Sequence, residues 1–122
     1  MTLNERLIAA LVPMGLPVSP DIYSGDAQEY ITFNFDLIPF RFADNVPQMY
    51  RALVQVHYYC PMALDSVQRR ENMKVNLVRA GFGWPEEINA TTDRRIIDGI
   101  QHYTLESECM MPVERIEGNG DT

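Results

Sequence analysis

The sequence predicts an α+β fold, in which a mixed or antiparallel β-sheet is covered on one face by two α-helices. Apolar residues recur at helical spacing near the N-terminus and again past the middle of the chain. Between and after these segments, long stretches alternate apolar and polar residues, which is typical of half-buried strands. With 122 residues the chain has room for one hydrophobic core, and one face of such a sheet needs an apolar cover.

The first helix is predicted to begin after Thr2, which can cap it, and to end at Pro13 and Gly15. The apolar residues of its buried face are Leu3, Leu7, Ile8, Leu11 and Val12. Residues 16–23 are expected to be a connector or an edge strand, because their two prolines cannot donate hydrogen bonds to a neighbouring strand.

Two strands are predicted in the first half of the chain. Residues 28–35 alternate, with Ile31, Phe33 and Phe35 on one face, and residues 36–47 are expected to break this strand as an aromatic loop between prolines. Residues 49–59 form the longest predicted strand. At about 3.3 Å per residue it reaches roughly 36 Å, comparable with the diameter of a domain of this size, so it must cross the domain or project from it.

The second helix is predicted over residues 66–80, with a capping box of Asp65 and Gln68 at its start and Gly81 at its end. Its expected apolar face consists of Val67, Val75, Leu77 and Val78. Residues 82–88 should be extended and packed, with a break at Pro85, and residues 92–95 should form a turn or exposed loop. A last alternating strand begins at residue 100. We therefore expect a single domain over residues 1–112 and a flexible C-terminal tail over residues 113–122.

Composition narrows the possible functions. The formal charge is -7, and no run of Lys or Arg forms a basic stripe, so tight nucleic-acid binding is not expected. No apolar stretch approaches the roughly 20 residues needed to cross a bilayer, and Glu5 and Arg6 interrupt the N-terminal pattern, unlike a signal peptide. Cys60 and Cys109 have no partner at zinc-ligand spacing, and we expect them to be buried free thiols in a reducing compartment.

A search for catalytic motifs finds none. The only imidazole bases are His57 and His102, in different predicted strands, where they could be neighbours across a sheet; no G-x-S-x-G turn accompanies them. The glutamates that occur in close pairs are expected to be solvated charges; they are Glu86, Glu87, Glu106 and Glu108. The prediction is a protein that is not an enzyme, with no catalytic residues, no cofactor and no metal ligands.

The aromatic segment Phe40-Arg41-Phe42 offers a more specific hypothesis. Large apolar side chains on an exposed segment often form a partner surface. The alternative, that the segment folds back and buries both rings, is equally compatible with the sequence.

Several segments together resemble the tail terminator, or tail completion, proteins of long-tailed bacteriophages and prophages. The matching stretches are residues 26–33 (Asp-Ala-Gln-Glu-Tyr-Ile-Thr-Phe), 42–45 (Phe-Ala-Asp-Asn), 54–57 (Val-Gln-Val-His), Leu77 with 80–82 (Ala-Gly-Phe), and Asp93 with His102-Tyr103. In that family a short helix, a strand opened by Tyr-Ile-Thr, an Ala-Asp-Asn loop, a long strand, a helix ending in Gly-Phe and a final strand follow in the same order.

The resemblance implies a virion structural and assembly protein, made in the cytoplasm of a bacterial host and located at the head–tail junction. Such a protein forms a ring, typically a homohexamer, that caps the tail tube, stops its polymerisation and joins it to the head. Its partners would be further copies of itself, the tail tube protein and a head-completion protein, while DNA passes through the ring without specific binding and no membrane is involved. The expected interface residues are Phe40, Phe42, Asp44 and Asn45.

Two other classes stay open at this point. Another head–tail connector or a minor capsid protein would share the size, acidity and α+β composition. A small ligand-binding domain or enzyme would place its site in a cleft beside His57 and His102.

Overall fold

The computed structural model describes residues 2–112 and confirms the predicted α+β class. The described chain contains α1 (Leu3–Leu11), the 3₁₀ helix η1 (Val12–Met14), β1 (Val18–Pro20), β2 (Tyr30–Ala43), β3 (Val46–Pro61), α2 (Val67–Arg79), β4 (Glu86–Asn89), α3 (Asp93–Ile97) and β5 (Ile100–Pro112). None of the helices in this part of the chain is long and apolar enough to cross a membrane.

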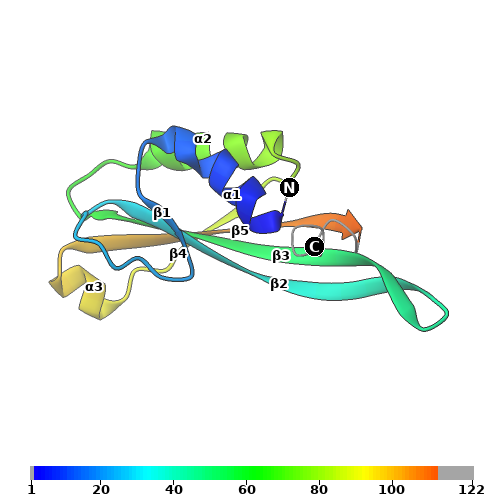
Figure 1. Cartoon of the computed structure of the whole chain (residues 1–122). Coiled ribbons are helices and arrows are strands. Elements are labelled where there is room, and N and C mark those ends of the chain that lie inside the picture. Colours follow the sequence, from blue (N-terminus) through cyan, green and yellow to red (C-terminus); the bar gives the residue numbers. More distant parts are fainter. Residues whose placement is uncertain (1, 113–122) are drawn as a thin grey trace.

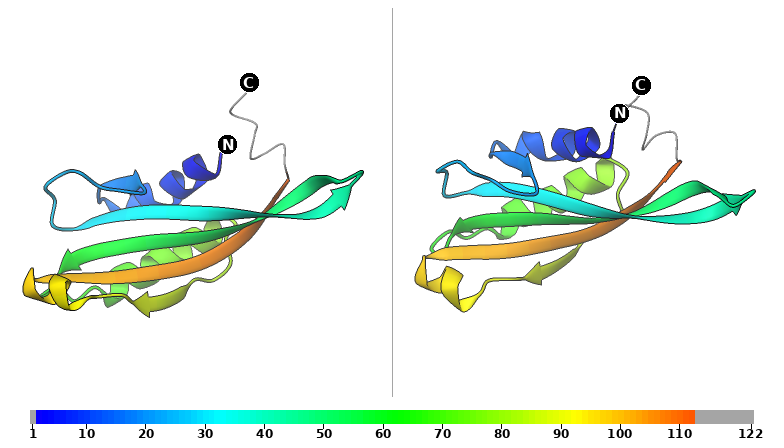
Figure 2. Two further views of the ribbon diagram at one scale, coloured as in Figure 1. Left: turned by 90° about the horizontal axis from the view of Figure 1, so that it is seen from below. Right: turned by 60° about the horizontal axis from the view of Figure 1, so that its bottom comes forward.

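The five strands form one mixed sheet in the order β1-β2-β3-β5-β4. Strand β1 runs parallel to β2, and the other neighbours are antiparallel. Figure 1 shows α1 and α2 side by side on one face of the sheet, as predicted, whereas α3 lies at one end of the sheet, away from the turn between β2 and β3. The opposite face of the sheet has no helix across its centre (Figure 2).

The core lies between α1, α2 and the face of the sheet that they cover. The alternation expected of the long strands is confirmed: Ile31 and Phe33 of β2, Val54 and Val56 of β3 and Leu105 of β5 are all buried. Because directly paired residues of antiparallel strands point to the same face, the register places the polar partners of these strands together on the uncovered face.

Helix α1 begins and ends where the sequence predicts. Thr2 and Glu5 form a capping box, in which Thr2 Oγ1 accepts from the Glu5 amide at 3.1 Å and Glu5 Oε1 accepts from the Thr2 amide at 2.7 Å. The chain then tightens into η1, which ends at Gly15 with φ +76°, a left-handed conformation that favours glycine.

The start and the buried face of helix α2 differ from the prediction. Its N-cap is Ser66, without a side-chain cap, so the expected capping box of Asp65 and Gln68 is wrong; Gln68 instead donates to Asn72 on the next turn. The buried face contains Met73, Lys74 and Leu77, while Val67 and Val78 are exposed, because the helix lies on the sheet through its 73–77 turn.

The end of α2 is a Schellman motif, as Gly81 indicates. The Phe82 amide donates to the Leu77 carbonyl and the Gly81 amide donates to the Val78 carbonyl, both at 3.0 Å, and Gly81 has φ +99°. The buried Phe82 ring then anchors the chain to the core, whereas Trp84, also expected to be packed, is exposed.

The loop predicted over residues 36–47 is the main error of the sequence reading. Strand β2 continues to Ala43 and keeps one register with β3 up to Ala43↔Val46, with a local irregularity at Arg41, whose φ is +55°. Asp44 and Asn45, with φ +52° and +64°, form the two-residue turn. Pro39 does not break the strand because its backbone faces the outer edge of the sheet, where no strand of the described chain needs its missing N–H.

The expected loop at residues 92–95 is also wrong, because Thr92 caps the short helix α3 by accepting a hydrogen bond from the Arg95 amide at 3.3 Å.

Cys60 and Cys109 are buried free thiols, as predicted. The tail expected over residues 113–122 lies outside the described residues.

Candidate functional site

The four expected interface residues lie together at the end of a β-hairpin that projects beyond the helices (Figures 1 and 2). We call residues 36–51 the hairpin arm; none of its residues is buried. Asp44 and Asn45 are the turn, and the Phe42 side chain beside it is 60% exposed. Phe40 is partly covered, with the Arg41 guanidinium 5.9 Å from its ring centroid. The sequence left open whether the two phenylalanine rings form an exposed partner surface or fold back and are buried. Burial of both rings is wrong, because Phe42 is exposed.

The hairpin arm carries apolar side chains although few other elements of the described chain contact it. Past the Met49↔Pro112 pair, β2 and β3 pair only with each other within the described chain. A two-stranded hairpin alone is marginally stable in water. The exposed apolar residues on and beside the arm are Ile38, Phe42, Val46 and Met110. Such a concentration on a projecting ribbon is typical of a surface that a partner covers.

The outer edge of β2 is open along the hairpin arm. The Ile31 amide donates to the Pro17 carbonyl and the Phe33 carbonyl accepts from the Asp21 amide, both at 2.8 Å, so odd-numbered residues of β2 direct their backbone groups away from β3. The same alternation directs those of Phe35 and Leu37 outward, beyond the reach of β1, which pairs only with residues 31–33. This edge could accept a strand from another chain.

The uncovered face of the sheet carries a hydrogen-bonded polar network centred on the two histidines. His57 Nδ1 lies 3.0 Å from His102 Nε2, and His57 Nε2 lies 2.9 Å from Asn34 Oδ1. The Thr104 hydroxyl lies 3.4 Å from His57 Nδ1. The sequence placed the histidines in different strands; the register, with His57↔Thr104 and Tyr59↔His102, makes them diagonal neighbours.

An aromatic stack borders this network. The ring centroids of Tyr23 and Tyr30 lie 4.5 Å apart, those of Tyr30 and Tyr59 lie 4.7 Å apart, and those of Tyr59 and His102 lie 4.3 Å apart. The Arg95 guanidinium of α3 lies 4.8 Å from the Tyr59 ring centroid. The stack covers one side of the histidine pair and leaves both imidazoles half-buried.

Burial disfavours the charged form of both histidines. Burial lowers the pKa of His57, an effect that the negative charge of Glu106 partly offsets. Burial, followed by the nearby His57 and Arg95, lowers the pKa of His102 to about 4. Neutral imidazoles fit a structural network at physiological pH.

The glutamate pairs do not all behave as predicted. Glu87 is not a solvated charge: it forms ion pairs with Arg70 and with Lys74, the latter at 3.0 Å, and so fastens the edge strand β4 to α2. Burial alone would lower the pKa of Lys74, but its hydrogen bonds to Glu71 and Glu87 raise it overall. Glu106 accepts a hydrogen bond of 3.1 Å from Gln55, whereas Glu86 and Glu108 are exposed as expected.

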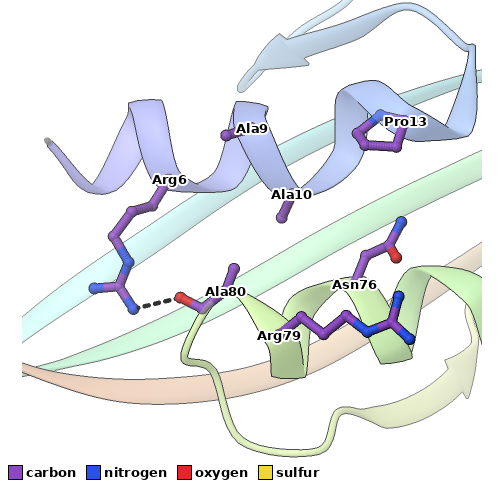
Figure 3. A pocket seen from close by; sticks show the side chains of 7 residues that line it. All are labelled: Arg6, Ala9, Ala10, Pro13, Asn76, Arg79 and Ala80. Atoms are coloured by element: carbon purple, nitrogen blue, oxygen red, sulfur yellow. Dashed lines mark hydrogen bonds between the residues drawn. The ribbon is translucent and has the colours of Figure 1, made fainter.

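A shallow hollow of about 360 Å³ lies between α1 and α2 (Figure 3). Its walls include Ala9 and Ala10 of α1 and Asn76 of α2, and Arg6 crosses one end. Arg6 Nη2 donates to the Ala80 carbonyl at 2.8 Å, and its guanidinium lies 4.8 Å from the Phe82 ring centroid. This arginine therefore caps the C-terminus of α2, and the hollow is the seam between two packed helices.

Within residues 2–112, no group of three or more His, Cys, Asp or Glu side chains could hold a metal ion. The structure thus gathers the expected interface residues at one place and brings together His57 and His102, which the sequence allowed to be neighbours across a sheet. The hydrogen bonds from this pair to Asn34 and Thr104, and the open strand edge, were not predicted. The alternation of His57 and His102 onto the polar faces of their strands was the available signal for the network.

Comparison with known proteins supports the fold alone. No family model and no curated protein matches the chain. Among the solved structures that are similar, one protein, whose name states no function, superposes with a TM-score of 0.59 at 14% sequence identity, and the match covers 91% of this chain and 90% of that one. At this identity the match shows a shared architecture over nearly the whole length of both chains.

Proposed function

We propose that this chain is a virion assembly protein of a long-tailed phage or prophage, forming a ring that caps the tail tube and joins it to the head. The observation that carries the proposal is the hairpin arm, because it presents exposed apolar side chains at a place where the described chain has nothing to cover them. The order of elements supports it, since a helix, a hairpin of two long strands, a helix and a final strand follow as in the family that the sequence resembles.

In the ring, the hairpin arm is the contact to a neighbouring copy or to the tube. An arm at one end of a subunit that binds a different surface of the next subunit makes a heterologous contact, and such contacts form a ring when the rotation from one subunit to the next closes. Two features suit the arm to this role: the outward backbone groups of Phe35 and Leu37 can pair with a strand, and Phe42 supplies an aromatic anchor.

The net charge of -7 agrees with a channel for DNA. Acidic subunits around a passage repel phosphates and keep DNA from adhering to the wall. The uncovered sheet face and its margin carry Asp36, Glu86, Glu106 and Glu108. Acid on this face is compatible with such a passage.

The oligomeric state tests the proposal. Native mass spectrometry of the wild-type chain, alone and with a candidate tail tube protein from the same genome, is expected to give a closed ring of copies. Phe42→Asp should abolish the ring and keep the far-UV circular dichroism. The matched control is Val67→Asp on α2, whose side chain is 57% exposed, and it should leave the ring intact. A chain that stays monomeric and does not bind the tube protein contradicts the proposal.

A further inference from the structure

The end of the molecule opposite the hairpin arm exposes a second group of apolar side chains. In Figures 1 and 2 the turn of the arm lies at one end of the sheet and α3 lies at the other. Three apolar residues on and beside α3, Met62, Ile96 and Ile97, are between 40% and 77% exposed. Large apolar side chains that gather in the open mark a surface that a partner covers.

Two of these residues form walls of an open hollow of about 390 Å³. The hollow is lined by Met62, Asn89, Thr91, Ile96 and Gln101. Gln101 donates from Nε2 to three carbonyl oxygens within residues 61–64, at 2.9–3.0 Å, and the Thr91 hydroxyl bonds to the backbone of His102. Because these polar groups are bonded to the chain itself, the hollow presents Met62 and Ile96 to a partner.

We propose that this hollow receives the tip of the hairpin arm of a second copy of the chain, with the Phe42 ring against Met62 and Ile96. The inference rests on the proposed function, in which copies of the chain contact one another, and it names the surface that the arm binds. A phenylalanine ring packs favourably against a methionine thioether. Aromatic side chains that fill a pocket of the partner supply much of the energy of an interface.

The charges beside the two surfaces are complementary. Asp44 lies in the turn of the arm, two residues after Phe42, and α3 carries Arg94 and Arg95. The Arg94 side chain is 81% exposed, so its ion pair with Asp98 at 3.4 Å is screened by water and is exchanged for a partner carboxylate at little cost. Two arms that met tip to tip would instead bring two Asp44 carboxylates together, which is unfavourable.

The position of the two surfaces makes the contact heterologous. Each copy offers its arm to one neighbour and its α3 end to another, because the arm and α3 lie at opposite ends of the sheet. A chain of such contacts forms a ring when the rotation from one copy to the next closes. One arm and one hollow per copy therefore suffice for a ring.

The test uses two variants of the full-length chain and native mass spectrometry. Phe42→Asp damages the arm and keeps the hollow, whereas Ile96→Asp, at an exposed position, damages the hollow and keeps the arm. Each variant alone should be monomeric with an unchanged far-UV circular dichroism spectrum. An equal mixture should give a dimer that does not grow, because the two variants share one intact arm and one intact hollow.

The matched control is again Val67→Asp on α2, which should form rings like the wild type. Rings formed by Ile96→Asp alone would overturn this inference and leave the proposed function standing. Dimers in the mixture from a chain that caps no tube would do the reverse, because they would support the contact and contradict the proposed function.

Disulfide trapping locates the contact and needs no stable ring. Ala43→Cys beside the turn and Ile97→Cys on α3 place thiols at exposed positions, while both native cysteines are buried. With oxidised glutathione, a mixture of the two variants should give a covalent dimer, and neither variant alone should give one. A dimer of Ala43→Cys with itself, or no covalent dimer in the mixture, would contradict the contact.

Discussion

The Arg6 guanidinium donates a hydrogen bond of 2.8 Å to the Ala80 carbonyl and lies over the Phe82 ring, so that a residue of the first helix caps the end of the second. The contact joins α1 to the Schellman motif of α2 and fixes the two helices against each other. Gly81 belongs to the same arrangement, because a Cβ at this position would lie 2.6 Å from Arg6 Nη2.

We therefore predict that Arg6→Met lowers the free energy of unfolding by about 1–3 kcal/mol, because the hydrogen bond from a charged donor and the cation–π contact are lost together. Urea denaturation followed by circular dichroism measures the change. Arg79→Met, an exposed position on the same hollow, is the control and should change stability by less than about 0.5 kcal/mol. Equal effects of the two substitutions would show that the cap contributes nothing.

A second prediction concerns the turn of the hairpin arm. Asn45 has φ +64°, a conformation that a β-branched residue adopts only with strain. Asn45→Val should therefore loosen the arm, with faster amide hydrogen exchange over residues 40–49 and a small change in melting temperature, since the core lies elsewhere. Asn45→Gly, which suits the turn, should keep or increase the protection. The idea fails if the valine variant keeps the arm amides as protected as in the wild type.

The histidine pair predicts a pH dependence of stability. Burial first, and then the nearby His57 and Arg95, lower the pKa of His102 from 6.5 to about 4 in the folded chain, so the unfolded chain binds this proton more readily. The contribution of neutral His102 is thus complete above about pH 6.5 and is lost as the pH falls toward 4. His102→Gln should remove part of the fall in melting temperature between pH 6.5 and 4.5. Parallel pH profiles for wild type and variant would exclude this cause.

Much of the fold follows from local patterns in the sequence. Thr2, Pro13 and Gly15 bound the first helix, Gly81 ends the second, and the alternation of the long strands assigns their buried faces correctly. These signals depend on residues close in sequence, and each carries a physical preference of its own.

The errors arise where tertiary context overrides a local preference. Pro39 indicates a break, yet it lies at an outer strand edge where its missing N–H has no cost. Asp44 and Asn45 tolerate the left-handed conformation and could have indicated the turn of a hairpin. The contact of His57 with His102 depends on a register between strands far apart in the chain, which no local pattern specifies.

The most direct test of the proposed function is a tube-capping experiment with a candidate tail tube protein from the same genome. Tubes assembled with the wild-type chain and viewed by negative-stain electron microscopy should be short and carry a ring at one end, and Val67→Asp should behave in the same way. Phe42→Asp, which places a charge on the exposed anchor of the hairpin arm, should give long, uncapped tubes. Tubes of unchanged length and bare ends in the presence of the wild-type chain would contradict the account.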